Sequence, residues 1–147
     1  MPILDYPFQH IQGYTYPALP VRIVNPDSGV QFKTYGLIDT GADASIIPGY
    51  IAEFLDHNVR RGTPCGGSTG SGVETVYEHT CRIDILRIND DGTVSDDVAI
   101  RIPERGKYIG VLEHCQFVLL GVSDFLHKYV LTIDYPRKVF SIRKPSK

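Results

Sequence analysis

The sequence has no long apolar run and few cysteines. Its longest uninterrupted apolar stretch runs only from Phe117 to Leu120, whereas a membrane-spanning helix needs about 20 residues. The three cysteines, Cys65, Cys81 and Cys115, are odd in number and contain no Cys-x-x-Cys pair. Reduced thiols are therefore expected, and a Cys65–Cys81 bridge across a hairpin is the less favoured alternative. Residues 1–10 lack the basic start and apolar core of a secretory signal. We expect a cytoplasmic protein with no membrane partner.

An excess of charge of either sign is also lacking. Fifteen Lys and Arg residues stand against 17 Asp and Glu residues, which gives a formal net charge of −2. This balance provides no electrostatic reason to expect nucleic acid as a partner. With 147 residues, 42% of them apolar, the chain is expected to form one domain over residues 1–147 and to fold without disulfides or metal.

What the sequence does contain is a strand-rich pattern. Residues 16–24 and 30–38 flank a turn-forming Asn-Pro-Asp-Ser-Gly cluster and predict a hairpin. Pro48 and Ser123 are placed to begin two short helices, over 49–55 and 123–130. Residues 103–110 read as a loop. The further strands are expected at residues 45–48, 73–88, 93–102 and 115–121, with a closing hairpin over 131–142. The pattern predicts an all-β fold with one or two short helices.

Asp39 ends the second strand of the predicted hairpin. It follows the apolar pair Leu37 and Ile38, and the residues after it, Thr40-Gly41-Ala42, are too small to cover a carboxylate. The structural alternative is an ordinary strand-to-turn corner, where Asp and Gly are common. The apolar strand before the tetrad and the downstream features favour a carboxylate that is presented for chemistry.

This tetrad and two later segments resemble those of the retropepsin-like aspartic proteases, in which an Asp-Thr/Ser-Gly-Ala loop follows a hydrophobic strand. Residues 66–72, with four glycines, lie where the flap of that family is expected, and Leu119-Leu120-Gly121 looks like its second hydrophobic-hydrophobic-Gly element. The resemblance covers nearly the whole chain and is strongest to the cellular and bacterial members. It implies a retropepsin-like acid protease fold, with a closed, β-barrel-like half.

Two segments depart from the retroviral pattern. Retroviral members usually carry Gly-Arg-Asn/Asp after the second element, whereas Gly121 is followed here by Val122 and Ser123, with Asp124 one position late. The arginine that would pair with Asp43 is therefore absent from its usual position. The glycine-rich stretch is also longer and more polar than the flap tip of those members.

The resemblance implies an aspartic endopeptidase that acts on polypeptides as a homodimer. Two aspartates about 3 Å apart repel by about 5 kcal/mol at an effective dielectric constant of about 20, so one is charged while the other holds a proton. The charged member takes a proton from water, and the protonated member polarises the peptide carbonyl. Because the chain has one such tetrad, the second Asp39 must come from another copy across a two-fold axis.

The resemblance also implies roles for the neighbours of the catalytic Asp39. Thr40 would hold the two loops in register across the axis, Gly41 would let the substrate backbone approach, and Leu120 and Gly121 would pack beneath the Asp39 loop. The residues expected to contact the substrate are Ala42, Asp43, Gly66, Gly67, Gly70 and Gly72.

Other readings stay open. A catalytically inactive retropepsin-like module would dimerise and bind an extended peptide by strand addition. A metal hydrolase built on the acidic loop would need further ligands that the sequence does not show.

Two local motifs have an alternative interpretation. Residues 87–98 break the EF-hand calcium-loop pattern at both ends, so residues 89–92 are predicted to form a hairpin turn. The glycine-rich stretch lacks the lysine of a phosphate-binding loop, which leaves a plain flexible loop as the alternative to a flap. We expect no metal and no cofactor.

Overall fold

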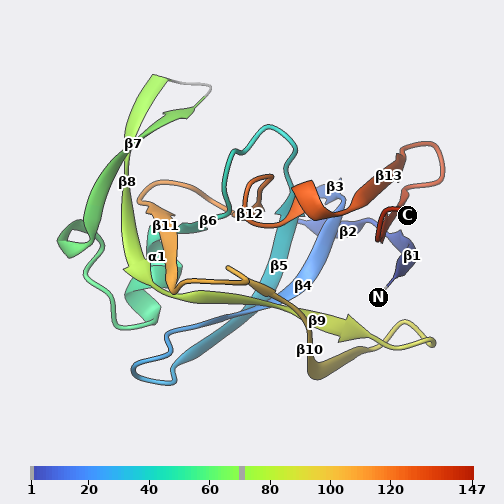
Figure 1. Ribbon diagram of the computed structural model, residues 1–147, viewed down its shortest axis with the longest axis horizontal. Helices are drawn as coiled ribbons and strands as arrows, with labels where there is room; N and C mark the ends of the chain where they lie inside the picture. Colours follow the sequence, from blue (N-terminus) through green and yellow to red (C-terminus); the bar gives the residue numbers. More distant parts are fainter. Residues whose placement is uncertain (1, 70–71) are drawn as a thin grey trace.

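Strands make up most of the regular structure. The computed structural model describes residues 2–69 and 72–147, so Gly70, an expected substrate-contacting residue, lies outside the described part. Across these ranges the helical segments are α1 (Gly49–Phe54) and two 3₁₀ turns, η1 (Val59–Arg61) and η2 (Leu126–Lys128). The all-β class predicted from the sequence is confirmed (Figure 1). None of the helices in the described ranges is long and apolar enough to cross a membrane.

A nine-stranded sheet forms the body of the molecule. Its spatial order is β10-β9-β4-β5-β12-β6-β11-β8-β7. The strands are β4 (Ala18–Val24), β5 (Gln31–Ile38), β6 (Ile46–Pro48), β7 (Thr63–Thr69), β8 (Gly72–Thr80), β9 (Arg82–Ile88), β10 (Val94–Ile102), β11 (Tyr108–Leu112) and β12 (Val118–Leu120). The predicted hairpin is present, because β4 and β5 pair from Ala18–Leu37 to Val24–Gln31.

The expected closed, barrel-like half is not formed. Within residues 2–69 and 72–147, β10 and β7 end the sheet on opposite sides and do not pair with each other. Figure 1 shows the reason: the β7–β8 hairpin projects away from the body, while β10 lies at the opposite end. The sheet is therefore open, and its β7 edge belongs to a projecting hairpin.

A second, smaller sheet joins the two ends of the chain. Its order is β1-β14-β13, and a separate hairpin pairs β2 with β3. The bounds are β1 (Ile3–Pro7), β2 (Gln9–Ile11), β3 (Tyr14–Tyr16), β13 (Val130–Asp134) and β14 (Val139–Arg143). The closing hairpin was predicted, but β1, β2 and β3 were not. The residues of these three strands are mostly exposed, so the strands show little alternation of apolar and polar residues. Tyr6 on β1 is an exception: its ring is buried edge-to-face against that of Phe140, with 5.8 Å between the ring centroids.

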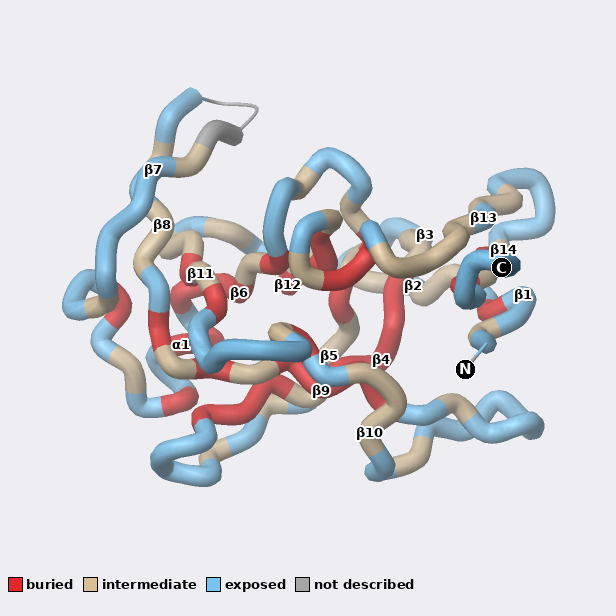
Figure 2. Tube along the Cα trace, viewed as in Figure 1, coloured by how far each residue is buried: buried red, intermediate tan, exposed pale blue. Residues whose placement is uncertain are grey.

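The apolar core lies where the central strands meet α1. Figure 2 shows the buried segments gathered along β4, β9, β12 and α1. Burying an aliphatic side chain of this size contributes about 1.5–3 kcal/mol relative to exposure. The fully buried aliphatic residues include Leu19, Val21, Ile23, Ile47, Ile51, Leu55, Ile83, Ile85, Ile102 and Leu120. This core holds the strand ends that carry the site.

Two strand predictions were wrong in their boundaries. The long strand expected over 73–88 is interrupted at Cys81, where the chain passes from β8, paired with β7 and β11, to β9, paired with β4 and β10. The loop expected over 103–110 contains the start of β11, which pairs with β8 on one side and β6 on the other. In both cases the partner strands decide the boundary, and these partners are distant in the sequence.

The helix expected over 123–130 shortens to η2, and Ser123 does not cap it. The backbone N–H of Ser123 donates instead to the carbonyl of Asp43 at 2.6 Å, and that of Val122 donates to the carbonyl of Ala42 at 3.0 Å. These bonds hold the segment against the loop that follows Asp39. The first turn of the expected helix is therefore used for a tertiary contact.

Two histidines stack where α1 and η1 meet the base of the β7–β8 hairpin. The rings of His57 and His79 lie 4.6 Å apart between centroids. A ring nitrogen of His79 lies 2.7 Å from the Val59 carbonyl oxygen, and one of His57 lies 2.7 Å from that of Thr80. Burial lowers the pKa of His79 below its ordinary value of 6.5, and the neighbouring His57 lowers it further.

This pair predicts a loss of stability in acid. Because the fold favours neutral His79, the unfolded chain takes up the proton more readily. The free energy of unfolding should therefore decrease as the pH falls below 6.5, the ordinary pKa of histidine. The decrease should end once the pH is below the pKa of His79 in the folded protein. Urea denaturation between pH 7.5 and about pH 4.5 should show a weaker pH dependence for His79→Gln than for the wild type. Replacing the exposed His10 by Gln is the control and should leave the dependence unchanged; equal slopes for all three proteins would contradict the assignment.

Candidate active site

Asp39 follows directly after β5, at an edge of the core. Its backbone N–H donates to the carbonyl of Leu120 at 3.1 Å, which extends the pairing of β5 with β12 by one residue. The N–H of Gly41 donates to Asp39 Oδ1 at 2.9 Å. This local bond is a typical Asx turn, and it orients one carboxylate oxygen toward the loop. The side chain of Asp39 is only partly buried, so the carboxylate is presented rather than enclosed.

The Asp39 loop, defined here as residues 39–45, crosses over the end of β12. The chain leaves the sheet after β5 and returns as β6, and β12 lies between these two strands, parallel to β5 and antiparallel to β6. Leu120 is fully buried at the end of β12. Leu120 and Gly121 thus lie against the loop.

Gly121 allows the loop to approach closely. A Cβ added at this position would lie 2.5 Å from the carbonyl carbon of Ala44 and 2.7 Å from its oxygen. These are backbone atoms, which cannot rotate away as a flexible side chain could. The contact therefore requires glycine for reasons of space.

Ser45 and Asp124 connect the two segments by side-chain hydrogen bonds. The Ser45 hydroxyl donates to Asp124 Oδ1 at 2.8 Å and accepts the N–H of Gly121 at 3.0 Å. The N–H of Ser45 donates to both carboxylate oxygens of Asp124, at 3.0 and 3.1 Å. Ser45 is buried, so these bonds satisfy polar groups that water does not reach. No role was predicted for Asp124 from the sequence. The one feature that could have indicated a role is that this acidic residue lies one position later after Gly121 than in the retroviral pattern.

A cleft of about 570 Å³ opens beside Asp39, between the Asp39 loop and the β7–β8 hairpin. Its lining residues are Asp39, Gly41, Ala42, Asp43, Ala44, Ile46, Cys65, Gly66, Gly67, Val76 and Leu119. The structure thus brings together most of the expected site residues. Thr40 and Gly72 are exposed and do not line the cleft. The apolar wall of Ile46, Val76 and Leu119 was missed, because an alternating strand does not show which face meets the cleft.

The cysteines near the cleft are held as neutral thiols. Burial raises the pKa of both Cys65 and Cys115 above the ordinary thiol value, and nearby carboxylates raise it further: Glu78 for Cys65, and Glu74 and Asp39 for Cys115. Since the thiolate is the nucleophile in cysteine chemistry, neither residue is suited to that role. All three cysteines are free.

Metal chemistry has no evident ligand set in the described part of the chain. No group of three or more His, Cys, Asp or Glu side chains converges there in a way that could hold a metal ion. The charged side chains that line the cleft are the two carboxylates, Asp39 and Asp43. The arrangement is suited to proton transfer by a carboxylate beside an apolar surface.

The Ser45 hydroxyl provides a test of the loop's support. Ser45→Ala should lower the free energy of unfolding by about 1–3 kcal/mol, because the buried N–H of Gly121 and the Asp124 carboxylate each lose a partner. Chemical denaturation would measure the loss. Ser28→Ala is the matched control. The Ser28 hydroxyl accepts a solvent-exposed hydrogen bond from the N–H of Val30 at 3.3 Å, so its removal should lower the free energy of unfolding by less than about 1 kcal/mol. Equal losses for the two variants would contradict the role given to Ser45.

Comparisons with known proteins bear on the fold. The chain matches no protein-family model and no curated protein. Among solved structures it is similar to a retropepsin-like aspartic protease from Rickettsia conorii, with a TM-score of 0.58 and 14% sequence identity. The alignment covers 97% of this chain and 89% of that chain. At this identity the likeness concerns the arrangement of the backbone, and it supports a retropepsin-like fold for the chain.

Proposed function

We propose that the protein is an aspartic endopeptidase in which two Asp39 carboxylates, one from each copy of a homodimer, activate water. The observation that carries the proposal is the position of Asp39 in a cleft that it shares with Asp43 and with apolar residues and glycines. A hydrogen bond to Oδ1 from Gly41 supports one oxygen of the carboxylate. The retropepsin-like fold is consistent with this reading.

The chemistry follows from placing two such carboxylates together. Their repulsion favours a state in which one is charged and the other holds the proton. The charged oxygen accepts a proton from a water molecule as that water attacks the peptide carbonyl carbon, and the protonated partner donates to the carbonyl oxygen. A single Asp39 can play only one of these parts at a time.

The second carboxylate would come from another copy of the chain. In the proposed dimer, Thr40 would contact its mate near the two-fold axis; its side chain is exposed and lies outside the cleft lining. Large apolar side chains are exposed near the N-terminus, with Leu4 at 64% and Tyr14 at 69%. Exposed apolar surface of this kind suits association between copies, and so does the outer edge of β1, which pairs with no further strand among the described residues.

The proposed substrate is a polypeptide in an extended conformation. Gly66 and Gly67 lie on β7 and line the cleft, and a Cβ added at Gly66 would meet no atom within 4 Å. An extended backbone could therefore lie along this strand, while Ile46, Val76 and Leu119 accept apolar side chains. Binding without cleavage, as in an inactive peptide-binding module, is the competing outcome that the next experiment separates.

Asp39→Asn should reduce cleavage of a peptide library by at least about 100-fold, because the amide cannot hold the shared negative charge or accept the proton. Products would be identified by mass spectrometry, with peptide binding measured in parallel. The control is Asp97→Asn, which removes an exposed carboxylate from β10 and should retain full activity. Persistent cleavage by the Asp39 variant would refute the assignment of Asp39; binding without cleavage by the wild type would support the inactive module.

Specific activity should decrease on dilution, because the proposed site exists only in the dimer and dissociation follows mass action. Sedimentation velocity and activity would be measured over the same concentration series. The loss of activity should follow the loss of dimer. A monomer with full specific activity would rule out the shared pair of carboxylates.

A further inference from the structure

Basic side chains gather around one buried carboxylate, away from the residues of the cleft. Arg22 on β4 lies opposite Asp84 on β9, and Asp84 lies opposite Arg101 on β10. Directly opposed residues of neighbouring strands share a face of the sheet. Arg82 lies two positions before Asp84 and therefore shares the same face. Asp84 is completely buried and is surrounded by three arginines.

Asp84 does not balance these charges. Arg82 binds both of its oxygens, with Nε at 2.7 Å from Oδ1 and an Nη at 3.1 Å from Oδ2. Arg22 reaches Oδ2 at 3.4 Å, whereas Arg101 Nε is 3.7 Å from Oδ1, beyond hydrogen-bond distance. Arg22 Nε is buried and has no hydrogen-bond partner among the described residues. One carboxylate thus faces three guanidinium groups. Arg22 also donates to the carbonyl of Asp96 at 3.1 Å and interacts electrostatically with the Asp96 carboxylate, so Arg82 and Arg101 are the two that depend on Asp84 alone within the cluster.

A pocket of about 250 Å³ lies beside this cluster, and we name it the basic pocket. Arg82, Arg101 and Lys107 all line it. A turn at Gly106, whose φ is +90°, directs the chain so that Lys107 lines the pocket. The backbone carbonyl of Lys107 accepts a hydrogen bond from the N–H of Cys81 at 3.0 Å, which holds Lys107 in this position. None of the residues that line the cleft beside Asp39 lines this pocket.

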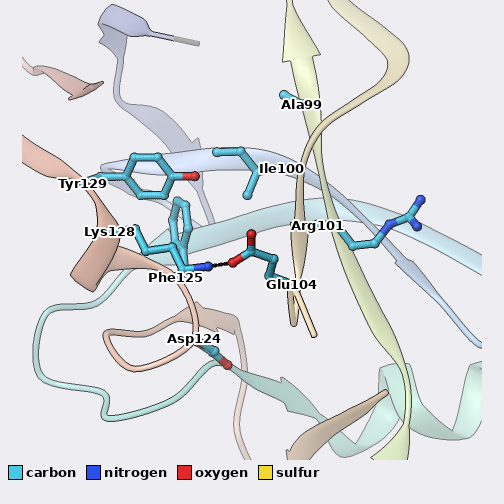
Figure 3. A pocket seen from close by; sticks show the side chains of 8 residues that line it. All are labelled: Ala99, Ile100, Arg101, Glu104, Asp124, Phe125, Lys128 and Tyr129. Carbon is cyan, nitrogen blue, oxygen red and sulfur yellow. Dashed lines mark ion pairs between the residues drawn. The ribbon is translucent and has the colours of Figure 1, made fainter. Parts of the chain in front are cut away.

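Two residues that line the basic pocket, Glu104 and Cys81, carry groups that could bear a negative charge. Glu104 lines the basic pocket and forms an ion pair with Lys128 on η2; Figure 3 shows this pair in a neighbouring pocket that Arg101 and Glu104 also line. Figure 3 also shows the guanidinium of Arg101 directed away from that pair. Cys81 is buried, which raises the pKa of its thiol to about 12, so it contributes no negative charge. The side chain of Arg101 is 55% exposed and accessible.

We propose that the basic pocket binds a phosphate-class oxyanion through Arg82, Arg101 and Lys107. Guanidinium groups present paired donors that match the oxygens of a phosphate, and a lysine ammonium adds a point charge. The attraction is local, since the whole chain carries a formal net charge of −2. Free phosphate and a phosphate monoester share this chemistry, and the pocket volume accommodates either.

The test is a titration followed in ¹H–¹⁵N correlation spectra. Inorganic phosphate and O-phosphoserine would be added separately at constant ionic strength, with chloride as the balancing salt. We expect saturable shifts confined to the amides of Arg82, Arg101, Gly106 and Lys107. Saturation by phosphate alone would identify a free anion, and tighter binding of phosphoserine would identify a monoester; both support the proposal. Shifts that grow linearly with concentration, or that spread over all basic residues, would overturn it.

Variants make the assignment specific. The double variant Arg101→Gln, Lys107→Gln should weaken binding at least about tenfold, because each position supplies a charge-assisted contact. Arg143→Gln, Lys144→Gln removes the same charges from exposed positions at the end of β14 and beyond it, and should bind as the wild type does. If the double variant loses its folded spectrum, Lys107→Gln alone replaces it, since Lys107 is exposed. Unchanged affinity in a folded variant would refute the site.

Discussion

The hydrogen bonds of Ser45 with Asp124 and Gly121 are the constraint on which the site depends. Within the described residues they tie the end of the Asp39 loop to the segment that follows β12, and Ser45 and Asp124 are separated by 79 positions in the sequence. Since both Ser45 and Gly121 are buried, an unmade bond here would leave polar groups without water or protein partners. The same contact requires glycine at position 121, because the loop backbone lies where a Cβ would be. The junction holds the end of the loop, and the bond from the Asp39 N–H to the Leu120 carbonyl holds its start.

In the described part of the chain, this junction holds the Asp39 loop through hydroxyl, carboxylate and backbone groups. The carboxylate of Asp124 accepts three hydrogen bonds from Ser45 and its backbone, and the N–H groups of Val122 and Ser123 bind the carbonyls of the loop. Asp43 is thereby left exposed at the cleft, with no ion pair in the described part of the chain. Backbone and hydroxyl donors support the loop, and its acidic side chains, Asp39 and Asp43, line the cleft.

Charge is separated within the fold. The cleft is lined by carboxylates, apolar groups and glycine, whereas four basic side chains lie around Asp84 or in the basic pocket: Arg22, Arg82, Arg101 and Lys107. A near-neutral net charge therefore conceals two regions of opposite character. The first presents two carboxylates beside an apolar surface, and the second presents three basic side chains. Composition alone distinguished neither region, because it averages over the surface.

The sequence by itself determined the hairpin that ends at Asp39 and the closing hairpin, because each depends on local alternation and turn chemistry. It predicted the glycine-rich stretch to be a flap or a flexible loop, and it did not determine that residues 66–69 lie on β7. It did not determine that the sheet stays open, that β1, β2 and β3 form, or that residues 123–130 give up most of a helix to bind the Asp39 loop. It also could not bring Ser45 to Asp124, or Arg82, Arg101 and Lys107 to one pocket. Those outcomes depend on which distant strands pair and which faces they bury, and only the tertiary structure decides that, because register and packing are set by partners remote in the chain.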